Sequence, residues 1–191
     1  YTIMWDFDPE AVYAGLYDVT VVDGNECSIE VSFEVVDPAL LTAGYSFGTI
    51  NCYGGTTEAT VTAQGGTAPY FLYDDEELVG EFVEGSYTVE GLVAGQYDYT
   101  IIDNNGCSVE VSFAIYQPTA IEIEVVSVID PLCFDAPTGS ITVTATGGTG
   151  ELMYSIDGEN YQSSGVFENL MAGTYTVSVM DANQCIATEE V

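Results

Sequence analysis

The main pattern along this chain is an alternation of apolar and polar side chains with a period of two residues. Between residues 97 and 102, the alternation places Tyr97, Tyr99 and Ile101 on one face of an extended segment. This period is typical of an antiparallel strand with one buried and one solvated face. No segment of the sequence shows a sustained apolar repeat of 3.6 residues, so the sequence predicts an all-β protein.

The same alternation recurs near the end of the chain. There it predicts that Tyr175, Val177 and Val179 point inward, and that Thr176 and Ser178 point outward. Turn residues separate this strand and its counterpart from their neighbours, because Asp103-Asn104-Asn105-Gly106 suits a tight hairpin. Glycine pairs at 65–66 and 147–148 mark further turns. Other strands are predicted over 58–64, 70–73, 108–116, 140–146 and 152–156.

Internal repetition organises these elements. AGLYDVTVVDGNEC begins at Ala14, AGQYDYTIIDNNGC at Ala94 and AGTYTVSVMDANQC at Ala172, with offsets of 80 and 78 residues between their cysteines. A second pair of matching segments begins at Cys52 and Cys133, 81 residues apart. A period of this size is the signature of a tandem array of folded units.

Three units follow from this period. Residues 1–36 are predicted to be the C-terminal part of an incomplete repeat, 37–116 a complete β-sandwich repeat, and 117–191 a repeat with its last strand truncated. We refer to them as the first, middle and last repeats. Six or seven short strands in about 80 residues predict an immunoglobulin-like antiparallel β-sandwich. The Gly-x-Tyr that opens the penultimate strand fits either a tyrosine corner or ordinary core filling.

The predicted repeats meet at Asp37-Pro38 and at Gln117-Pro118. Proline fixes its own φ and restricts the residue before it, so each joint has little slack. A rod of stiff modules is therefore expected. Because the first repeat lacks opening strands, we also expect the parent chain to continue beyond Tyr1 and Val191.

Charge narrows the range of functions. The chain has 31 Asp plus Glu and no Lys, Arg or His, for a net charge of −31. Nucleic acids and anionic membrane surfaces are bound through Lys and Arg, so binding to either is not expected. Membrane insertion is not expected either, because no apolar run approaches the ~20 residues of a membrane span. Catalysis that uses a histidine base or a lysine nucleophile is excluded as well. Hydrophobic residues at 47% nevertheless indicate a folded chain.

Together the motifs resemble a known family. A cysteine, then G-x-I-T-V-x-A-x-G-G-T, a tyrosine-rich strand and A-G-x-Y-x-V-x-V-x-D-x-N-x-C is similar to the SprB-type repeat of the giant surface adhesins of gliding bacteria. Residues 133–185 match best, 52–107 also match, and 1–27 match only the second half. The first repeat departs from the pattern, because its interval from Tyr1 to Ala14 is shorter than in the other two.

The resemblance implies a very long secreted filament at the extracellular cell surface, exported by the type IX system and used in gliding and attachment. Its implied partners are neighbouring repeats of the same chain, the motility or anchoring machinery, and extracellular polysaccharide or solid surfaces. No enzyme activity is implied.

The cysteines recur with the repeats, which points to disulfides in an oxidising compartment. Two pairings remain open. One lies within each repeat, Cys52–Cys107 and Cys133–Cys185; the other joins neighbouring repeats through Cys52–Cys185. Strand order places the two cysteines of one repeat at opposite poles, about 20 Å apart, which disfavours the first pairing. In both, the partner of Cys27 lies outside this sequence.

Two further kinds of site were considered. Oxygen-rich loops offer weak calcium candidates at Asp74, Asp75, Asp103, Asn105 and Asp157, although none forms an EF-hand and solvated turns explain them equally well. No other cofactor is expected. Carboxylate catalysis by the cluster that starts at Asp74 would require an apolar pocket that an exposed turn lacks, so no enzyme is predicted.

Two functions therefore compete. In the first, the repeats form a structural stalk that extends a filament and transmits force. In the second, the repeats bind glycans or surfaces through exposed aromatics such as Tyr53, Tyr73 or Tyr161. Aromatics recurring in every copy would favour the second, yet Phe134 aligns with Tyr53 while Ser155 aligns with Tyr73. We therefore favour the stalk.

Overall fold

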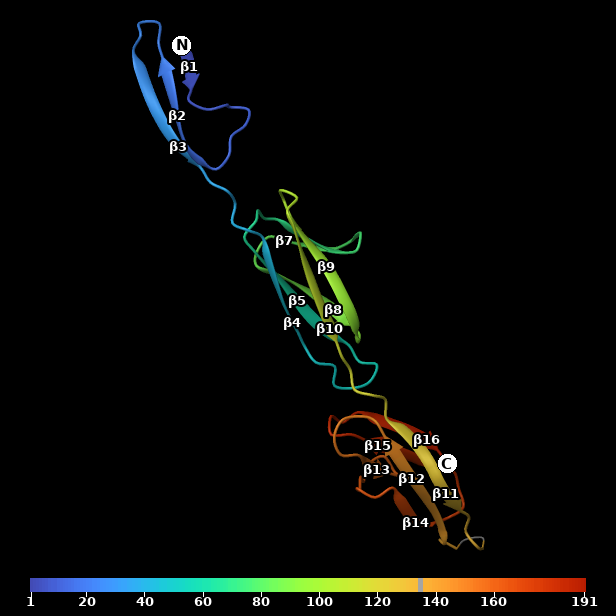
Figure 1. Ribbon diagram of the computed structural model, residues 1–191. Coiled ribbons are helices and arrows are strands. Elements are labelled where there is room, and N and C mark those ends of the chain that lie inside the picture. The colour runs from blue at the N-terminus through green and yellow to red at the C-terminus, as the bar shows by residue number, and fades with distance from the viewer. Residues whose placement is uncertain (134–135) are drawn as a thin grey trace.

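The computed structural model describes residues 1–133 and 136–191, so Phe134 lies outside the described residues. The described part contains strands and no helix, and accordingly no helix that could span a membrane. All strand pairs are antiparallel. Figure 1 shows the strands as three groups in a row, and each sheet takes its strands from one predicted repeat.

The strands in chain order are β1 (Thr2–Trp5), β2 (Gly15–Val22), β3 (Ser28–Val35), β4 (Thr42–Phe47), β5 (Thr57–Gln64), β6 (Tyr70–Asp74), β7 (Glu77–Phe82), β8 (Ser86–Leu92), β9 (Gly95–Asp103), β10 (Ser108–Ile115), β11 (Glu122–Ile129), β12 (Gly139–Thr146), β13 (Met153–Ser155), β14 (Val166–Leu170), β15 (Thr176–Met180) and β16 (Ile186–Glu190).

The middle repeat is a sandwich of two sheets, with strand orders β4-β5-β8 and β10-β9-β6-β7. Alternating side chains of both sheets meet in one core, where Val61, Leu72 and Ile101 are fully buried. Phe113 of β10 stacks on Tyr45 and Phe47 of β4 in the opposite sheet, with ring centroids 5.1 and 5.5 Å apart. The predicted immunoglobulin-like sandwich is therefore confirmed for this segment.

The last repeat has the same layout with shorter strands. Its sheets have the orders β11-β12-β14 and β13-β15-β16, around a smaller core that contains Ile141, Val143, Val177 and Val179. The prediction that Ser178 points to solvent is wrong, because this side chain is buried. It pairs with Ser155, whose hydroxyl accepts N–H bonds from the loop after β13. That loop covers the outer face at this point.

The first repeat differs from the other two, because it has a single sheet, β1-β2-β3. No strand among its described residues covers the apolar face of this sheet, and Ile3, Trp5 and Val31 are exposed. Aromatic rings pack on one another across that face: Phe7 makes T-shaped contacts with Trp5 and Phe33 and a tilted contact with Tyr17, and Tyr17 stacks on Phe33.

A tyrosine corner recurs in all three repeats. The hydroxyl of Tyr97 donates to the carbonyl of Val93 at 3.0 Å. Tyr17 and Tyr175 make the same bond to the residue four positions earlier, at 2.6 and 2.9 Å. Of the two readings of the Gly-x-Tyr motif, the corner is therefore the one present.

A glycine turn holds the segment that leads into each of the last two repeats. This turn follows β5 in the middle repeat and β12 in the last repeat. Gly66 donates its N–H to the carbonyl of Ala39, and Gly148 donates to Thr119. The preceding glycines, Gly65 and Gly147, have φ of +74° and +85°. An added Cβ there would lie 2.1 Å from the oxygen of Leu40 or 1.8 Å from that of Ala120, so both positions require glycine.

Candidate functional site

The site with the most unusual chemistry is the junction between the middle and last repeats. It begins with a turn between β15 and β16, Asp181–Cys185. The Asp181 carboxylate is buried and accepts N–H bonds from Asn183 and Cys185, both at 2.9 Å, and from Thr149 at 2.8 Å. Three donors around one carboxylate fix the turn and hold Cys185 at its end, directly before β16.

These bonds also set the charge state of Asp181. Burial alone would raise the pKa of the carboxyl group, but the backbone N–H donors of Cys185, Thr149 and Asn183 outweigh it and hold the pKa below its ordinary value. Asp103 has a lowered pKa for the same reasons, with donors from Thr67, Cys107 and Asn105. Both turns therefore contain ionised carboxylates at neutral pH.

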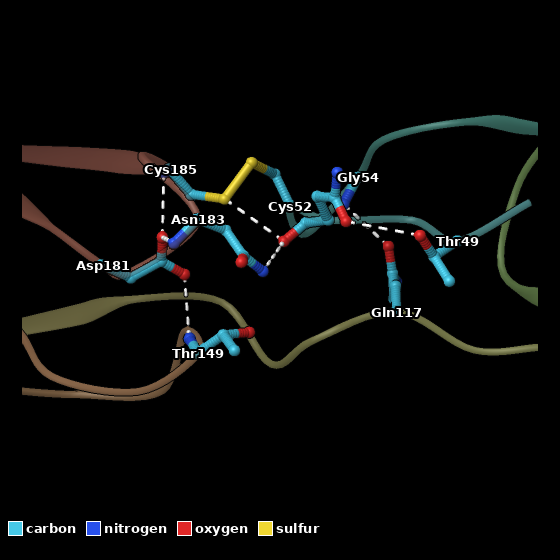
Figure 2. Close-up of a disulfide and its surroundings, with 9 residues drawn as sticks. Thr49, Cys52, Gly54, Gln117, Thr149, Asp181, Asn183 and Cys185 are labelled. Carbon is cyan, nitrogen blue, oxygen red and sulfur yellow. Dashed lines mark hydrogen bonds between the residues drawn. A yellow bond between two sulfur atoms is a disulfide. The ribbon is translucent and has the colours of Figure 1, made fainter.

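Cys185 forms a disulfide with Cys52, which lies in the connection between β4 and β5 of the middle repeat. The Cα atoms are 5.5 Å apart, within the usual range, and 133 positions separate the two residues in sequence. In the chain-entropy model a loop of this size stabilises the folded state by about 5 kcal/mol. Figure 2 shows the bond bridging the two repeats.

Of the two pairings left open by the sequence, the structure contains the one between repeats. The bonds Cys52–Cys107 and Cys133–Cys185 are not formed, because each repeat holds its two cysteines at opposite poles. Cys27, Cys107 and Cys133 are exposed and free in this chain.

Polar contacts surround the disulfide. Asn183 donates its side-chain Nδ2–H to the carbonyl of Asn51 at 3.0 Å, and the side-chain oxygen of Gln117 accepts the N–H of Gly54 at 2.7 Å. The sulfur of Cys185 lies 3.3 Å from the same carbonyl oxygen of Asn51. Because a disulfide sulfur has no hydrogen to donate, this last contact is packing. Gln117 belongs to the proline joint, so the joint and the disulfide hold the same interface.

Asn51 and Asn183 were not predicted from the sequence, and Gln117 was predicted only as part of the proline joint. The signal available for Asn183 was the recurrence of D-x-N-x-C at 23–27, 103–107 and 181–185. For Asn51 there was no periodic signal, since it acts through a loop contact with the neighbouring repeat.

A cavity of about 390 Å³ lies beside the disulfide. Tyr53, Pro118, Ile121, Gln184 and Ile186 are among the residues that line it. Tyr53 lies at the rim of the cavity and is 61% exposed. The other two aromatics predicted as binding platforms, Tyr73 and Tyr161, are half-buried and lie elsewhere.

The calcium candidates are dispersed. Asp103 and Asn105 belong to a turn whose carboxylate already accepts three backbone N–H bonds, and Asp157 accepts bonds from Asn160, Glu159 and Ser155. The side-chain amide of Asn160 contributes most to lowering the pKa of Asp157. Asp74 and Asp75 form the tight turn between β6 and β7, where Asp75 has a φ of +49°. Within the described residues, no cluster of three metal-binding side chains occurs.

No curated protein matches this chain. Among solved structures, it is similar to a C-terminal 282-residue fragment of intimin in complex with the intimin-binding domain of the translocated intimin receptor, with 16% identity and a TM-score of 0.43 over 82% of this chain and 64% of that one. It is also similar to the human desmocollin-1 ectodomain, with 12% identity and a TM-score of 0.35 over 92% of this chain and 43% of that one.

The chain thus spans less than two thirds of the length of either structure. One family matches within it: residues 125–160 match the SprB repeat. This segment runs from β11 to the loop after β13, inside the region where the sequence resemblance was strongest. The predicted resemblance to SprB-type repeats is therefore confirmed by this match over residues 125–160.

Proposed function

We propose that this chain is a stalk segment of a secreted cell-surface adhesin, in which linked β-sandwiches extend a filament and transmit force. The SprB repeat at residues 125–160 supports a surface-adhesin role. A disulfide between repeats is consistent with an extracellular location, since such bonds persist in oxidising compartments. The observation that carries the stalk function is the position of that disulfide at a joint between two repeats.

Force applied to the two ends follows the covalent chain. With the Cys52–Cys185 bond in place, tension passes from residue 52 directly to residue 185 and bypasses everything between them. Strands β5 to β15 lie within the bridged segment and are thereby shielded from unfolding, whereas β4 and β16 lie outside it. A stalk built in this way keeps its length under load.

Single-molecule pulling from the two termini tests this function. Fully extended chain gains at most about 3.5 Å per residue, so the 133 positions spanned by the disulfide represent about 460 Å of extension. We expect this extension to be missing in the oxidised chain and to appear in the Cys52→Ser variant.

The Cys133→Ser variant is the matched control, because it removes a free cysteine and leaves the junction intact. It should behave as the unmodified chain does. If the oxidised chain releases the full extension at the same force as Cys52→Ser, the stalk function is contradicted.

The exposed ring of Tyr53 at the rim of the junction cavity favours a second candidate, binding of a neutral polysaccharide at this place. An aromatic face packs well against the apolar face of a sugar ring, and Gln184 is near to donate and accept hydrogen bonds. Tyr53→Ala should abolish retention on a polysaccharide column while leaving the pulling result unchanged. Equal retention of both proteins would exclude this site.

A further inference from the structure

The uncovered sheet of the first repeat presents an apolar face. Pairing between β1, β2 and β3 puts Ile3, Trp5, Tyr17, Val19, Val21, Ile29, Val31 and Phe33 on the same side. The opposite side is mainly polar and carries Asp18, Thr20, Ser28, Glu30, Ser32 and Glu34 together with Met4, Leu16 and Val22. A sheet with one apolar and one polar face is built to be covered on the apolar side.

Equivalent side chains of the middle repeat show how much a covering sheet lowers the exposed fraction. Val111 and Phe113 of β10 are each 4% exposed, whereas Val31 and Phe33, their counterparts in β3, are 51% and 38% exposed. The difference arises because β4 and β5 lie over β10 and β9 in the middle repeat. The first repeat has the same inward residues without that cover.

The aspartate of the first repeat also lacks a partner. Asp103 accepts on its Oδ2 the N–H of Thr67, and Asp181 accepts that of Thr149, both from the glycine turn that follows β5 or β12. Asp23 makes the same two turn bonds, to Asn25 and Cys27, through its Oδ1. In the described structure no glycine turn supplies its third donor.

The turn Asp103–Cys107 of the middle repeat also lacks the contact that its counterpart Asp181–Cys185 makes with a neighbouring repeat. Its hydrogen bonds reproduce those of Asp181–Cys185, yet Cys107 is exposed and free. In the linked turn, the Asn183 amide bonds across the junction to the carbonyl before Cys52. In the free turn, the Asn105 amide bonds to Thr67 of its own repeat instead.

We propose that a β-hairpin of the β4–β5 type, from chain that precedes β1, covers the face of β1–β2–β3 and bonds to Cys107 through a cysteine in its connecting loop. This one hairpin would cover the apolar face, supply the third N–H donor to Asp23 and provide a partner for Cys107. In the middle repeat the same hairpin covers β9 and β10, leads into the glycine turn that reaches Asp103, and carries Cys52 to the next repeat.

This inference deepens the proposed stalk function, on which it rests for the source of the hairpin. It assigns a docking surface and a second junction, so that the array would be linked at each joint. The bond itself forms by two exchange steps with oxidised glutathione. The thiolate of one of the two cysteines attacks the disulfide of oxidised glutathione and releases one glutathione thiolate. The thiol of the other cysteine then displaces the second glutathione, which gives one protein disulfide and two reduced glutathiones.

The register of the strands defines the test. Val19 of β2 and Tyr99 of β9 are equivalent positions, 80 residues apart. Trp5 pairs with Val19 and Asp74 pairs with Tyr99, so β1 is equivalent to β6 and Tyr1 is equivalent to Tyr70. Residues 37–69 placed directly before Tyr1 of the full chain therefore supply the missing hairpin and glycine turn in frame. We expect non-reducing peptide mapping, after folding in a glutathione buffer, to show the added copy of Cys52 bonded to Cys107, with Cys27 and Cys133 still free.

A second readout reports covering of the face. Trp5 is the single tryptophan of the chain, and it lies half-exposed on that face. Trp5 contacts Phe7, which packs on Tyr17 and Phe33 beneath the expected hairpin, so the emission of Trp5 should shift to shorter wavelength in the extended chain. Serine in place of the added cysteine should preserve the shift, whereas serines in place of the added copies of Tyr45 and Phe47 should abolish it.

Unchanged Trp5 emission would overturn the proposal, as would a bond from the added cysteine to Cys27, to Cys133 or to a second molecule. These outcomes are separate from failure of the stalk function, because the pulling experiment depends only on Cys52–Cys185 in the unextended chain.

Discussion

At the scale of single residues, the tyrosine corner is a hydrogen bond that the fold repeats in each unit. Tyr97→Phe removes the bond to the Val93 carbonyl and leaves the ring packed against Phe113. We expect the free energy of unfolding to fall by about 1 kcal/mol, the usual net value of such a bond. Urea denaturation of the variant measures it.

Tyr116→Phe is the control for this change, because Tyr116 is exposed. A loss of stability in the control equal to that in Tyr97→Phe would show that the hydroxyl at the corner contributes nothing specific.

The turn aspartates predict a dependence of stability on pH. The pKa values of Asp103 and Asp181 are lower in the folded chain than in the unfolded one. Their contribution is therefore present above the unfolded pKa of about 3.9 and is lost as pH falls through the lower folded pKa. We expect the thermal midpoint to drop below about pH 4, and this drop to be smaller in a variant with Asp103→Asn and Asp181→Asn.

A variant that lost as much stability on acidification as the parent chain would show that other groups determine the acid limit. Glu84→Gln, at an exposed turn, is a suitable control and should leave the pH profile unchanged.

Sequence patterns located these residues unevenly. The recurrence of D-x-N-x-C marked the aspartates and cysteines, and the hairpin was predicted at Asp103–Gly106. Burial of the carboxylate was not predicted, because its third N–H donor comes from a glycine turn 36 positions away in the chain. Residue types alone favoured solvent or calcium as the ligand.

At the scale of elements, the glycine turn that anchors each repeat should tolerate no side chain. In Gly147→Ala, the new methyl would lie 1.8 Å from the Ala120 oxygen in addition to the cost of positive φ. Gly158→Ala has a φ of +75° but meets nothing within 4 Å. We expect the control to lose about 1 kcal/mol and Gly147→Ala to lose several times more, as measured by urea denaturation.

Equal losses in the two variants would show that the entry segment yields to the added methyl, so that the turn does not fix the joint.

Period-two alternation predicted most central strands closely. The interval 58–64 became β5 (Thr57–Gln64), and 108–116 became β10 (Ser108–Ile115). No strand was predicted at β7 (Glu77–Phe82), an edge strand whose pattern is interrupted by Gly80 and whose register with β6 shifts next to Tyr73. Edge strands bury little on either face, so their sequences have weak periodicity.

At the scale of the whole molecule, charge is the main variable. A net charge of −31 with no Lys, Arg or His leaves carboxylate repulsion uncompensated. Raising NaCl from about 10 mM to about 150 mM shortens the screening length from about 30 Å to about 8 Å. We expect the thermal midpoint at neutral pH to rise over this range.

At about pH 2, well below the ordinary carboxyl pKa of about 4, the same salt change should have little effect, because nearly all of the carboxyl groups are then protonated. Salt stabilisation of equal size at both pH values would point to a cause other than charge repulsion.

Strand order disfavoured disulfides within each repeat but did not decide between them and a disulfide joining neighbouring repeats. The rotation of one repeat on the next depends on contacts such as Gln117 with Gly54 and Asn183 with Asn51, which come from loops. Such contacts leave no periodic trace, so the junction had to be seen in the folded chain.

The Cys52–Cys185 bond turns the intervening residues into a closed ring within the chain. A single backbone cut between residues 53 and 184 opens that ring but leaves both ends covalently joined. Such a nicked molecule keeps its full mass until it is reduced, and only a second cut within the ring releases material. The chain can therefore be cut once anywhere between residues 53 and 184 without being severed.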